Sequence, residues 1–379
     1  MPGRRGEGRH PRAWIEGVAC SVDAAIEAAL GRLRESRHPL FAGLGCDVEG
    51  ARKLVRLAKL MGASIDHLSS TATGLELAVA RDVGAFLTTP SEAAARADTF
   101  FVLGPEAGQA GTELLERVLE TTPKLAARDA PRSVIWVGPR LKAKTRSPHL
   151  EITSFQVPAS QIAAVLAALR ARLAHRAVGK APLSASRLST IVEKLRQAKF
   201  GVAVWSSPAL GPLAIEALAG LIRDLNERTR FSCLPVAGAD NATGVAMTLT
   251  WLTGFPSNID FSRGEADYDP WRSDAARLVR SGEVDLALWI SAYRHHWPDW
   301  ARDVPVIALT ARADATQRRP ALVEIEVGTP GIDHDSVEFS PATGVLAFRA
   351  ATAHRAIPSV AKVIDSFCTE LAERGRAHR

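Results

Sequence analysis

Two short segments place histidine beside aspartate, and both residue types are common metal ligands. Residues 295–300 read His-His-Trp-Pro-Asp-Trp, and residues 332–335 read Ile-Asp-His-Asp. Neighbouring histidines project apart on a helix and on a strand, so His295, His296 and Asp299 do not form a ready ligand set. We therefore predict a surface or interface role for residues 295–300 and a solvated loop for residues 332–335, with no metal bound by the chain.

A glycine-rich turn at residues 41–50 has the composition of a phosphate-binding loop. The sequence Phe-Ala-Gly-Leu-Gly-Cys-Asp-Val-Glu-Gly joins an apolar strand to a helix, and phosphates approach helix N-termini at such turns. The third glycine is out of step with the dinucleotide-binding fingerprint, and no Lys-Ser/Thr pair follows it. The pattern favours a plain strand-to-helix turn. Asp66 stands where a ribose-binding acid would stand, so a nucleotide site stays open as an alternative.

The least generic passage is residues 240–264, in which glycines, polar turn residues and aromatic side chains are dense. We interpret it as a loop that follows a predicted strand end, where open α/β sheets bind ligands. The passage predicts either a pocket or a subunit contact, with plain structural packing as the alternative. The candidate residues are Asn241, Gly244, Trp251, Phe255, Asp260 and Arg263.

The chain lacks the sequence patterns of common hydrolases and of cysteine-based metal sites. Neither G-x-S-x-G nor H-E-x-x-H occurs. The four cysteines, Cys20, Cys46, Cys233 and Cys368, occur singly, so they provide neither a disulfide framework nor a zinc cluster. We expect them to be small buried side chains in a reducing compartment, which indicates a cytoplasmic location.

The formal net charge is +6 at pH 7, and the basic residues are spread along the sequence. No basic run is interleaved with aromatic residues, so nucleic-acid binding is not expected. The densest basic cluster suits an acidic small molecule or an acidic partner subunit. It consists of Arg140, Lys142, Lys144 and Arg146. No apolar run reaches the roughly 18 residues of a membrane span, and residues 1–12 predict a frayed tail rather than a secretory signal.

Apolar strands alternate with amphipathic helices, which is typical of an α/β protein with parallel or mixed sheets covered by helices. We predict helices at residues 22–36, 49–61, 112–119, 160–176, 186–199, 211–228 and 358–374. We predict strands at residues 40–44, 64–66, 99–103, 133–137, 200–205, 231–235, 284–290 and 305–309, and short β segments at 323–327 and 337–348. The predicted parts are a flexible tail (1–19), a discontinuous α/β domain (20–96 plus 185–330), an inserted and trimmed α/β domain (97–184), and C-terminal β segments with one helix (331–379).

Several blocks of the chain together resemble the B subunit of formylmethanofuran dehydrogenase, a molybdopterin-oxidoreductase-like family. The resemblance is strongest to the shortened form found in the formyltransferase/hydrolase complex of methylotrophic bacteria. The blocks are residues 39–46, 57–66, 82–84, 97–98, 200–202, 224–226, 241–244, 254–264 and 305–308. The resemblance implies a degenerate molybdopterin-oxidoreductase-like fold, with domains like those of formate dehydrogenase and dimethylsulfoxide reductase.

The chain departs from the catalytic members of that family at the redox site. Those members carry an N-terminal cysteine cluster for an iron–sulfur centre, which needs about four thiolates, whereas Cys20 is the only cysteine here before Cys46. They also carry a metal-binding Cys-His-Gly, for which this chain has Ala72, Thr73 and Gly74. Alanine has no donor atom, and a threonine hydroxyl is a poor substitute for a thiolate. The resemblance therefore implies that the redox chemistry is lost.

What the resemblance implies is a non-catalytic scaffold subunit of a complex in one-carbon metabolism and formaldehyde oxidation. That complex converts formyl-tetrahydromethanopterin to formate through a methanofuran-type carrier. Its implied partners are an amidohydrolase-like A subunit that holds the metals, a C subunit and a formyltransferase D subunit, and no cofactor is expected on this chain. Two alternatives stay open: an active molybdopterin oxidoreductase, and a thiamine- or nicotinamide-dependent oxidoreductase. Neither a Gly-Asp-Gly thiamine opening nor a clean G-x-G-x-x-G occurs.

The family's carriers have an anionic glutamate tail, so the resemblance suggests that the basic cluster steers the carrier. Reversing the charges of Arg140, Lys142, Lys144 and Arg146 is expected to weaken carrier use, most strongly at low salt, in steady-state assays of the complex. Unchanged turnover with an unchanged salt dependence would refute this role.

Overall fold

The computed structural model describes residues 12–104, 121, 131–139, 149–236, 238–311 and 321–377. The chain forms two compact units. Unit 1 comprises Met1–Ser70, Asp240–Phe339 and Leu346–Arg379, and unit 2 comprises Thr71–Ala239 and Ser340–Val345. The predicted helix at 112–119 and the basic cluster at 140–146 lie outside the described residues, and the four-part domain division stays a prediction. In the part that is described, no helix combines the length and the apolar character needed to cross a membrane.

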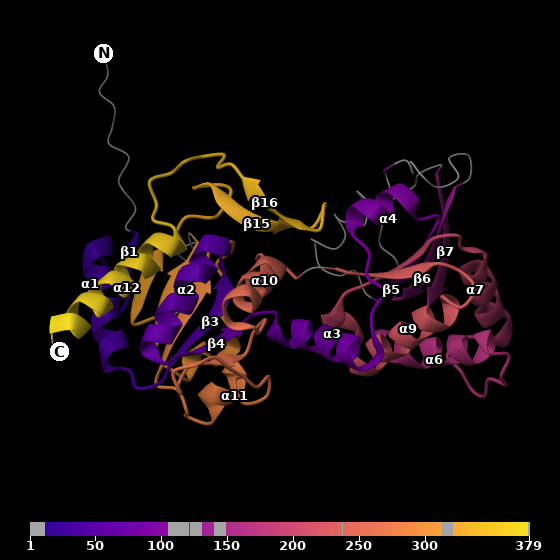
Figure 1. Ribbon diagram of the computed structural model, residues 1–379, viewed down its shortest axis with the longest axis horizontal. Coiled ribbons are helices and arrows are strands. Elements are labelled where there is room, and N and C mark those ends of the chain that lie inside the picture. The colour runs from indigo at the N-terminus through magenta and orange to yellow at the C-terminus, as the bar shows by residue number, and fades with distance from the viewer. Residues whose placement is uncertain are drawn as a thin grey trace, which may run out of the picture. The chain divides into compact units, whose positions relative to one another are not determined.

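Unit 1 is built on a nine-stranded mixed sheet (Figure 1). Five parallel strands form its centre, in the order β4 (Ser64–His67), β3 (Pro39–Gly45), β12 (Leu286–Ser291), β13 (Val306–Thr310) and β14 (Val323–Glu326). Antiparallel strands extend both edges: β10 (Ile259–Asp260) and β11 (Asp267–Tyr268) on one side, β1 (Ala13–Ile15) and β2 (Val18–Cys20) on the other. β3, β12 and β13 are buried along their whole length, which explains their nearly continuous apolar sequences.

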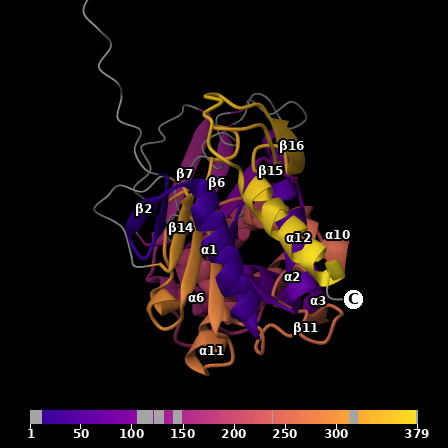
Figure 2. The ribbon, with the colours of Figure 1, turned by 90° about the vertical axis from the view of Figure 1, so that its left-hand side faces the viewer.

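Helices cover both faces of the unit 1 sheet. On one face lie α1 (Val22–Glu35), α2 (Val48–Met61), α10 (Ala242–Thr253) and α12 (Val360–Ala377). On the other face lie α11 (Ala275–Arg280) and the 3₁₀ helix η2 (Asp299–Arg302). Figure 2 shows α12 running beside α1 and α2, where Phe367 is fully buried. Trp289 of β12 fills the core of the opposite face.

Unit 2 is built on a five-stranded parallel sheet. Its strand order is β7 (Leu150–Gln156), β6 (Arg132–Gly138), β5 (Thr99–Leu103), β8 (Gly201–Trp205) and β9 (Phe231–Pro235). One face packs against η1 (Ala159–Gln161), α6 (Ile162–Leu173), α7 (Ala185–Gln197), α8 (Ser207–Leu210), α9 (Pro212–Leu225) and α3 (Ser70–Val83). The other face packs against α4 (Pro90–Arg96). A separate two-stranded sheet pairs β15 (Ser336–Ser340) with β16 (Val345–Arg349).

The predicted fold class is confirmed at the level of an α/β protein with parallel and mixed sheets covered by helices. The strands predicted at 99–103 and 231–235 coincide with β5 and β9 residue for residue. The long helix predicted at 160–176 is shorter, because η1 precedes it and α6 ends at Leu173, before His175 adopts a left-handed φ of 57°. Edge strand β7 was not predicted, since its partly exposed side chains do not form an apolar run.

The interpretation of residues 240–264 as a loop is wrong for residues 242–253, which form α10. The density of glycines, polar turn residues and aromatic side chains suggested a loop, and threonine hydroxyls can compete for the hydrogen bonds of a helix backbone. In α10 the hydroxyls of Thr248, Thr250 and Thr253 instead donate to carbonyls four residues earlier, at 2.7–2.8 Å. Burial of Val245 and Leu249 against the sheet then favours the helix.

Two glycines with similar backbone angles separate steric from conformational effects. Gly43 in β3 has φ +82°, and a Cβ there would lie 2.5 Å from the carbonyl oxygen of Ile290. Gly254 has φ +87°, and a Cβ there would meet nothing within 4 Å. Gly254→Ala is expected to cost about 1–2 kcal/mol of left-handed strain, and Gly43→Ala at least twice that because a backbone clash is added. Urea unfolding measures both, and equal losses would contradict this account.

Candidate functional site

In the turn after β3, the carboxylate of Asp47 occupies the N-terminus of the following helix, α2. Asp47, only 5% exposed, caps α2: its Oδ1 accepts a hydrogen bond from the backbone N–H of Gly50 at 2.9 Å. A Cβ at Gly50 would lie 3.0 Å from that same oxygen, so the glycine makes room for the cap. An incoming phosphate would meet this buried carboxyl group instead of free N–H groups. The geometry therefore favours a plain strand-to-helix turn over a nucleotide site.

Of the six pocket candidates, Asn241 and Gly244 lie together at the start of α10. Asn241 has a left-handed φ of 60°; its Nδ2 donates to the carbonyl of Cys46 at 2.9 Å, and its Oδ1 accepts from the N–H of Phe339 at 2.8 Å. A Cβ at Gly244 would lie 2.2 Å from Asn241 Oδ1, so only glycine fits. Next to it, Asp240 accepts a hydrogen bond from Arg294 Nε at 2.6 Å. These side chains join β3, α10 and β15.

The other four pocket candidates are dispersed over unit 1. Trp251 is 64% exposed on α10, and Arg263 is exposed. Phe255 stacks on Tyr268, with ring centroids 5.2 Å apart and planes within 8°. Asp260 lies in a polar cluster at the amino ends of β3 and β4. The contacts of the described residues thus unite only two of the six, and a pocket or subunit contact here stays a prediction.

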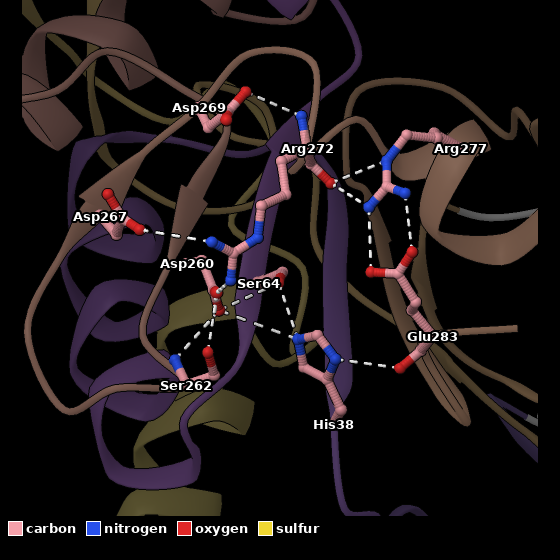
Figure 3. Close-up of polar contacts among 9 residues, drawn as sticks. All are labelled: His38, Ser64, Asp260, Ser262, Asp267, Asp269, Arg272, Arg277 and Glu283. Atoms are coloured by element: carbon pink, nitrogen blue, oxygen red, sulfur yellow. Dashed lines mark hydrogen bonds and ion pairs between the residues drawn. The ribbon is translucent and has the colours of Figure 1, made fainter. Parts of the chain in front are cut away.

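The most extensive polar cluster surrounds Asp260 (Figure 3). Asp260 accepts hydrogen bonds from the hydroxyl of Ser262 at 2.7 Å and from Ser64 at 3.3 Å. Arg272 Nη2 lies 3.3 Å from its Oδ2, and His38 Nε2 lies 3.8 Å from its Oδ1. The neighbouring carboxylate of Asp260 raises the pKa of His38. Although burial opposes it, the nearby imidazole of His38 and the hydrogen bonds from Ser262 hold the pKa of Asp260 well below its usual range.

This cluster contains the residue types of a serine-hydrolase triad but not its geometry. Ser64 and Asp260 both face the same ring nitrogen of His38, and the other nitrogen, Nδ1, lies 3.0 Å from the carbonyl oxygen of Glu283. A triad requires the carboxylate on Nδ1 and an accessible serine, whereas Ser64 is 1% exposed. The cluster is a structural network that fastens β10 to β4.

The His-Asp segment at 295–300 is not gathered into a metal site. The side chain of His295 is 5% exposed; its Nε2 lies 3.3 Å from Glu324 Oε1 and accepts a hydrogen bond from Trp297 Nε1 at 3.2 Å. The predicted surface role is therefore wrong for His295, whereas His296 and Asp299 are exposed. Among the described residues, no group of three His, Cys, Asp or Glu side chains could hold a metal ion.

The prediction of a solvated loop at residues 332–335 is wrong for Asp333. Its side chain is 2% exposed, pairs with the guanidinium of Arg355 and accepts the N–H of Thr329 at 2.8 Å. Asp335 is exposed, yet its Oδ1 accepts the N–H of Ala351 at 2.8 Å. The two aspartates fasten this turn to the segment that leads into α12.

The residues predicted to stand at the family's metal-binding motif, Ala72, Thr73 and Gly74, fall in the first turns of α3 and are partly buried. They belong to unit 2, whereas the six pocket candidates belong to unit 1. Two residues further along, Glu76 accepts a hydrogen bond from the hydroxyl of Ser207, and burial raises the pKa of Glu76. This carboxyl group links α3 to the start of α8.

Asp66 serves the packing of unit 1. Its carboxylate accepts hydrogen bonds from the N–H of Ala275 at 2.7 Å and from Asn258 Nδ2 at 3.0 Å. Burial raises the pKa of Asp66 to about 7. Sequence patterns did not reveal its partners, nor the network of His38, because nothing local distinguishes a buried carboxylate from an exposed one.

Asp66→Asn tests the effect of this buried carboxyl group on stability. The pKa of Asp66 in the folded chain lies above the reference value of 3.8, so its stabilising contribution is full below about pH 4 and is lost as the pH rises toward 7. The unfolding free energy of the wild type should therefore fall relative to that of Asp66→Asn between pH 4 and 7, by more than about 1 kcal/mol in urea unfolding.

Asp82→Asn is the matched control for this experiment. Asp82 has a 62% exposed side chain that pairs with the neighbouring Arg81. This variant should keep the pH profile of the wild type. A difference between the wild type and Asp66→Asn that does not change with pH would contradict the account.

Comparison with known proteins gives relatives over nearly the whole chain. No protein-family model matches it. The chain is 30% identical over 364 residues to the B subunit of the formyltransferase/hydrolase complex Fhc of Methylorubrum extorquens, a match that covers 96% of this chain and 97% of the relative. It is 29% identical over 331 residues to the B subunit of the tungsten-containing formylmethanofuran dehydrogenase 2 of Methanocaldococcus jannaschii, covering 80% of this chain and 74% of that one.

A solved structure is similar over the same extent. It is the crystal structure of the formyltransferase/hydrolase complex from Methylorubrum extorquens in complex with methylofuran. One of its chains matches with a TM-score of 0.84 at 31% sequence identity, covering 96% of this chain and 99% of that chain.

Proposed function

The chain belongs to the family of formyltransferase/hydrolase complex B subunits, and from this membership we propose that it is one subunit of such a complex. In this proposal the complex moves a formyl group from tetrahydromethanopterin to a methanofuran-type carrier and hydrolyses it to formate. The partners are an amidohydrolase-like A subunit, a C subunit and a formyltransferase D subunit. The observation that carries the proposal is the match to a chain of a formyltransferase/hydrolase complex through both units of this fold.

Within the complex we assign this chain a scaffold role without redox chemistry. At the positions of the family's metal-binding motif, Ala72 offers no donor atom and Thr73 offers only a hydroxyl. Glu76, on the same helix, is already engaged by Ser207. The proposal therefore places the metals of the hydrolytic step on the amidohydrolase-like partner and leaves the carrier to the assembled complex.

We further propose that the two units are degenerate relatives of molybdopterin-oxidoreductase domains. The similarity to the B subunit of a tungsten-containing formylmethanofuran dehydrogenase supports this origin. The division into residues 1–19, 20–96 plus 185–330, 97–184 and 331–379 is part of the same proposal. A cytoplasmic location is supported by the four cysteines, which form no disulfide and of which Cys46, Cys233 and Cys368 are buried.

Affinity purification of the tagged chain from its own host, with mass spectrometry and metal analysis, tests the proposed function. We expect an amidohydrolase-like protein and a formyltransferase to co-purify in a fixed ratio, with no molybdenum, tungsten or iron assigned to this chain. The host carrying the tag alone is the control. A lone chain that carries a pterin or another redox cofactor would overturn the proposal in favour of the oxidoreductase alternatives.

A further inference from the structure

Residues 258–283, here called the 258–283 segment, are fastened to the central sheet of unit 1 through polar side chains. The segment contains β10, β11 and α11 and lies at the β4 side of the sheet. In β4, the carboxylate of Asp66 accepts hydrogen bonds from Asn258 and Ala275 of the segment, as described above. At the amino ends of β3 and β4, Asp260 and Glu283 of the segment both contact His38. Ile259 and Leu278 of the segment are also buried in the two cores of unit 1, so these polar contacts add to hydrophobic packing.

His38 joins the two ends of the segment through its two ring nitrogens. Nδ1 lies 3.0 Å from the carbonyl oxygen of Glu283, and Nε2 lies 2.9 Å from the hydroxyl of Ser64 and 3.8 Å from Asp260 Oδ1 (Figure 3). The carbonyl and the carboxylate are both acceptors, so both ring nitrogens are required to carry protons if both ends are to be held. A neutral imidazole has one N–H and can hold only one end.

The charged groups around His38 favour its protonated form. Asp260 is the nearest, and the carboxylates of Asp285 and Glu283 also act on the ring. Asp285 additionally accepts the backbone N–H of His38, at 3.4 Å. Two cations offset these carboxylates among the described residues of this cluster. Arg272 lies on Asp260 at 3.3 Å and on Asp267 at 3.8 Å, and Arg277 pairs with Glu283 at 2.7 and 3.0 Å. The carboxylates outnumber the two guanidinium groups, which leaves the surroundings of His38 acidic.

We propose that His38 is a proton-operated latch for the 258–283 segment. With both nitrogens protonated, the ring holds Asp260 and Glu283 at once and the segment is closed against β3 and β4. Loss of the Nε2 proton leaves Nδ1–H on Glu283, turns Nε2 into an acceptor for Ser64, and removes the ion pair with Asp260. The segment then opens more often, while the core of unit 1 stays folded.

The pH range of the latch follows from the two partners. Because the pKa of His38 is raised, its contribution to the stability of the closed segment is full below the ordinary histidine value of 6.5. This contribution is lost as the pH rises through the raised pKa. The lowered pKa of Asp260 keeps the carboxylate charged well into the acid range. The latch is thus closed below the ordinary pKa of histidine and is released as the pH rises through the raised pKa of His38.

Hydrogen exchange of the full-length chain between pH 6 and 9 tests the latch. The results are expressed as protection factors, so that the intrinsic pH dependence of exchange is removed. Amides of residues 259–274 are expected to lose about tenfold protection as the pH rises, the loss expected when one charge-assisted hydrogen bond becomes neutral, while amides of β12 keep theirs. A histidine NMR titration in the same range should place the His38 transition at the pH where protection falls.

Two variants and the wild type together decide the outcome. His38→Gln, which cannot titrate, should show low protection of 259–274 that does not change with pH. His354→Asn, at an exposed histidine of unit 1 with a left-handed φ of 48° that asparagine tolerates, should behave as the wild type. The proposal is overturned if wild-type protection is constant over this range, if it falls at a pH other than the His38 transition, or if His38→Gln keeps the wild-type profile. The first two outcomes need no variant to fold.

Discussion

The central strands of unit 1 are buried on both faces, and this constraint determines where its polar chemistry can lie. β3, β12, β13 and β14 have no face toward solvent, so their polar neighbours must find partners at the strand ends. At the carboxyl ends Asp47 caps α2, and Asn241 joins β3 to α10 and β15. At the amino ends His38 and Asp260 fasten the 258–283 segment.

The same constraint explains why polar clusters here are structural. Carboxyl edges of parallel sheets usually bind ligands because turn backbone and helix N-termini are free there. In unit 1 the carboxylate of Asp47 occupies the N-terminus of α2 at this edge. A cap of this kind is compatible with the scaffold role proposed above.

Buried polar residues account for most differences between the sequence-based expectations and the structure. Asp333 and His295 lie in segments rich in proline, glycine or charge, which suggests solvent exposure. Both side chains are nevertheless buried, Asp333 against Arg355 and His295 against Glu324. Their partners are 22 and 29 residues away along the chain. No local pattern encodes such a contact. The helix α10 was also missed because its stability depends on tertiary contacts, through the burial of Val245 and Leu249.

The sequence by itself determined the fold class, most of the central strands and the family resemblance. Strand burial on both faces leaves a continuous apolar signature, as in β5, and the absence of a side-chain donor atom at Ala72 is visible without any structure. Only the tertiary structure decided that Asp66, Asp260 and Asn241 form hydrogen bonds between separate elements of the fold. Their roles depend on partners brought together by folding, and the pKa of Asp66 is raised only because packing removes water from its carboxyl group.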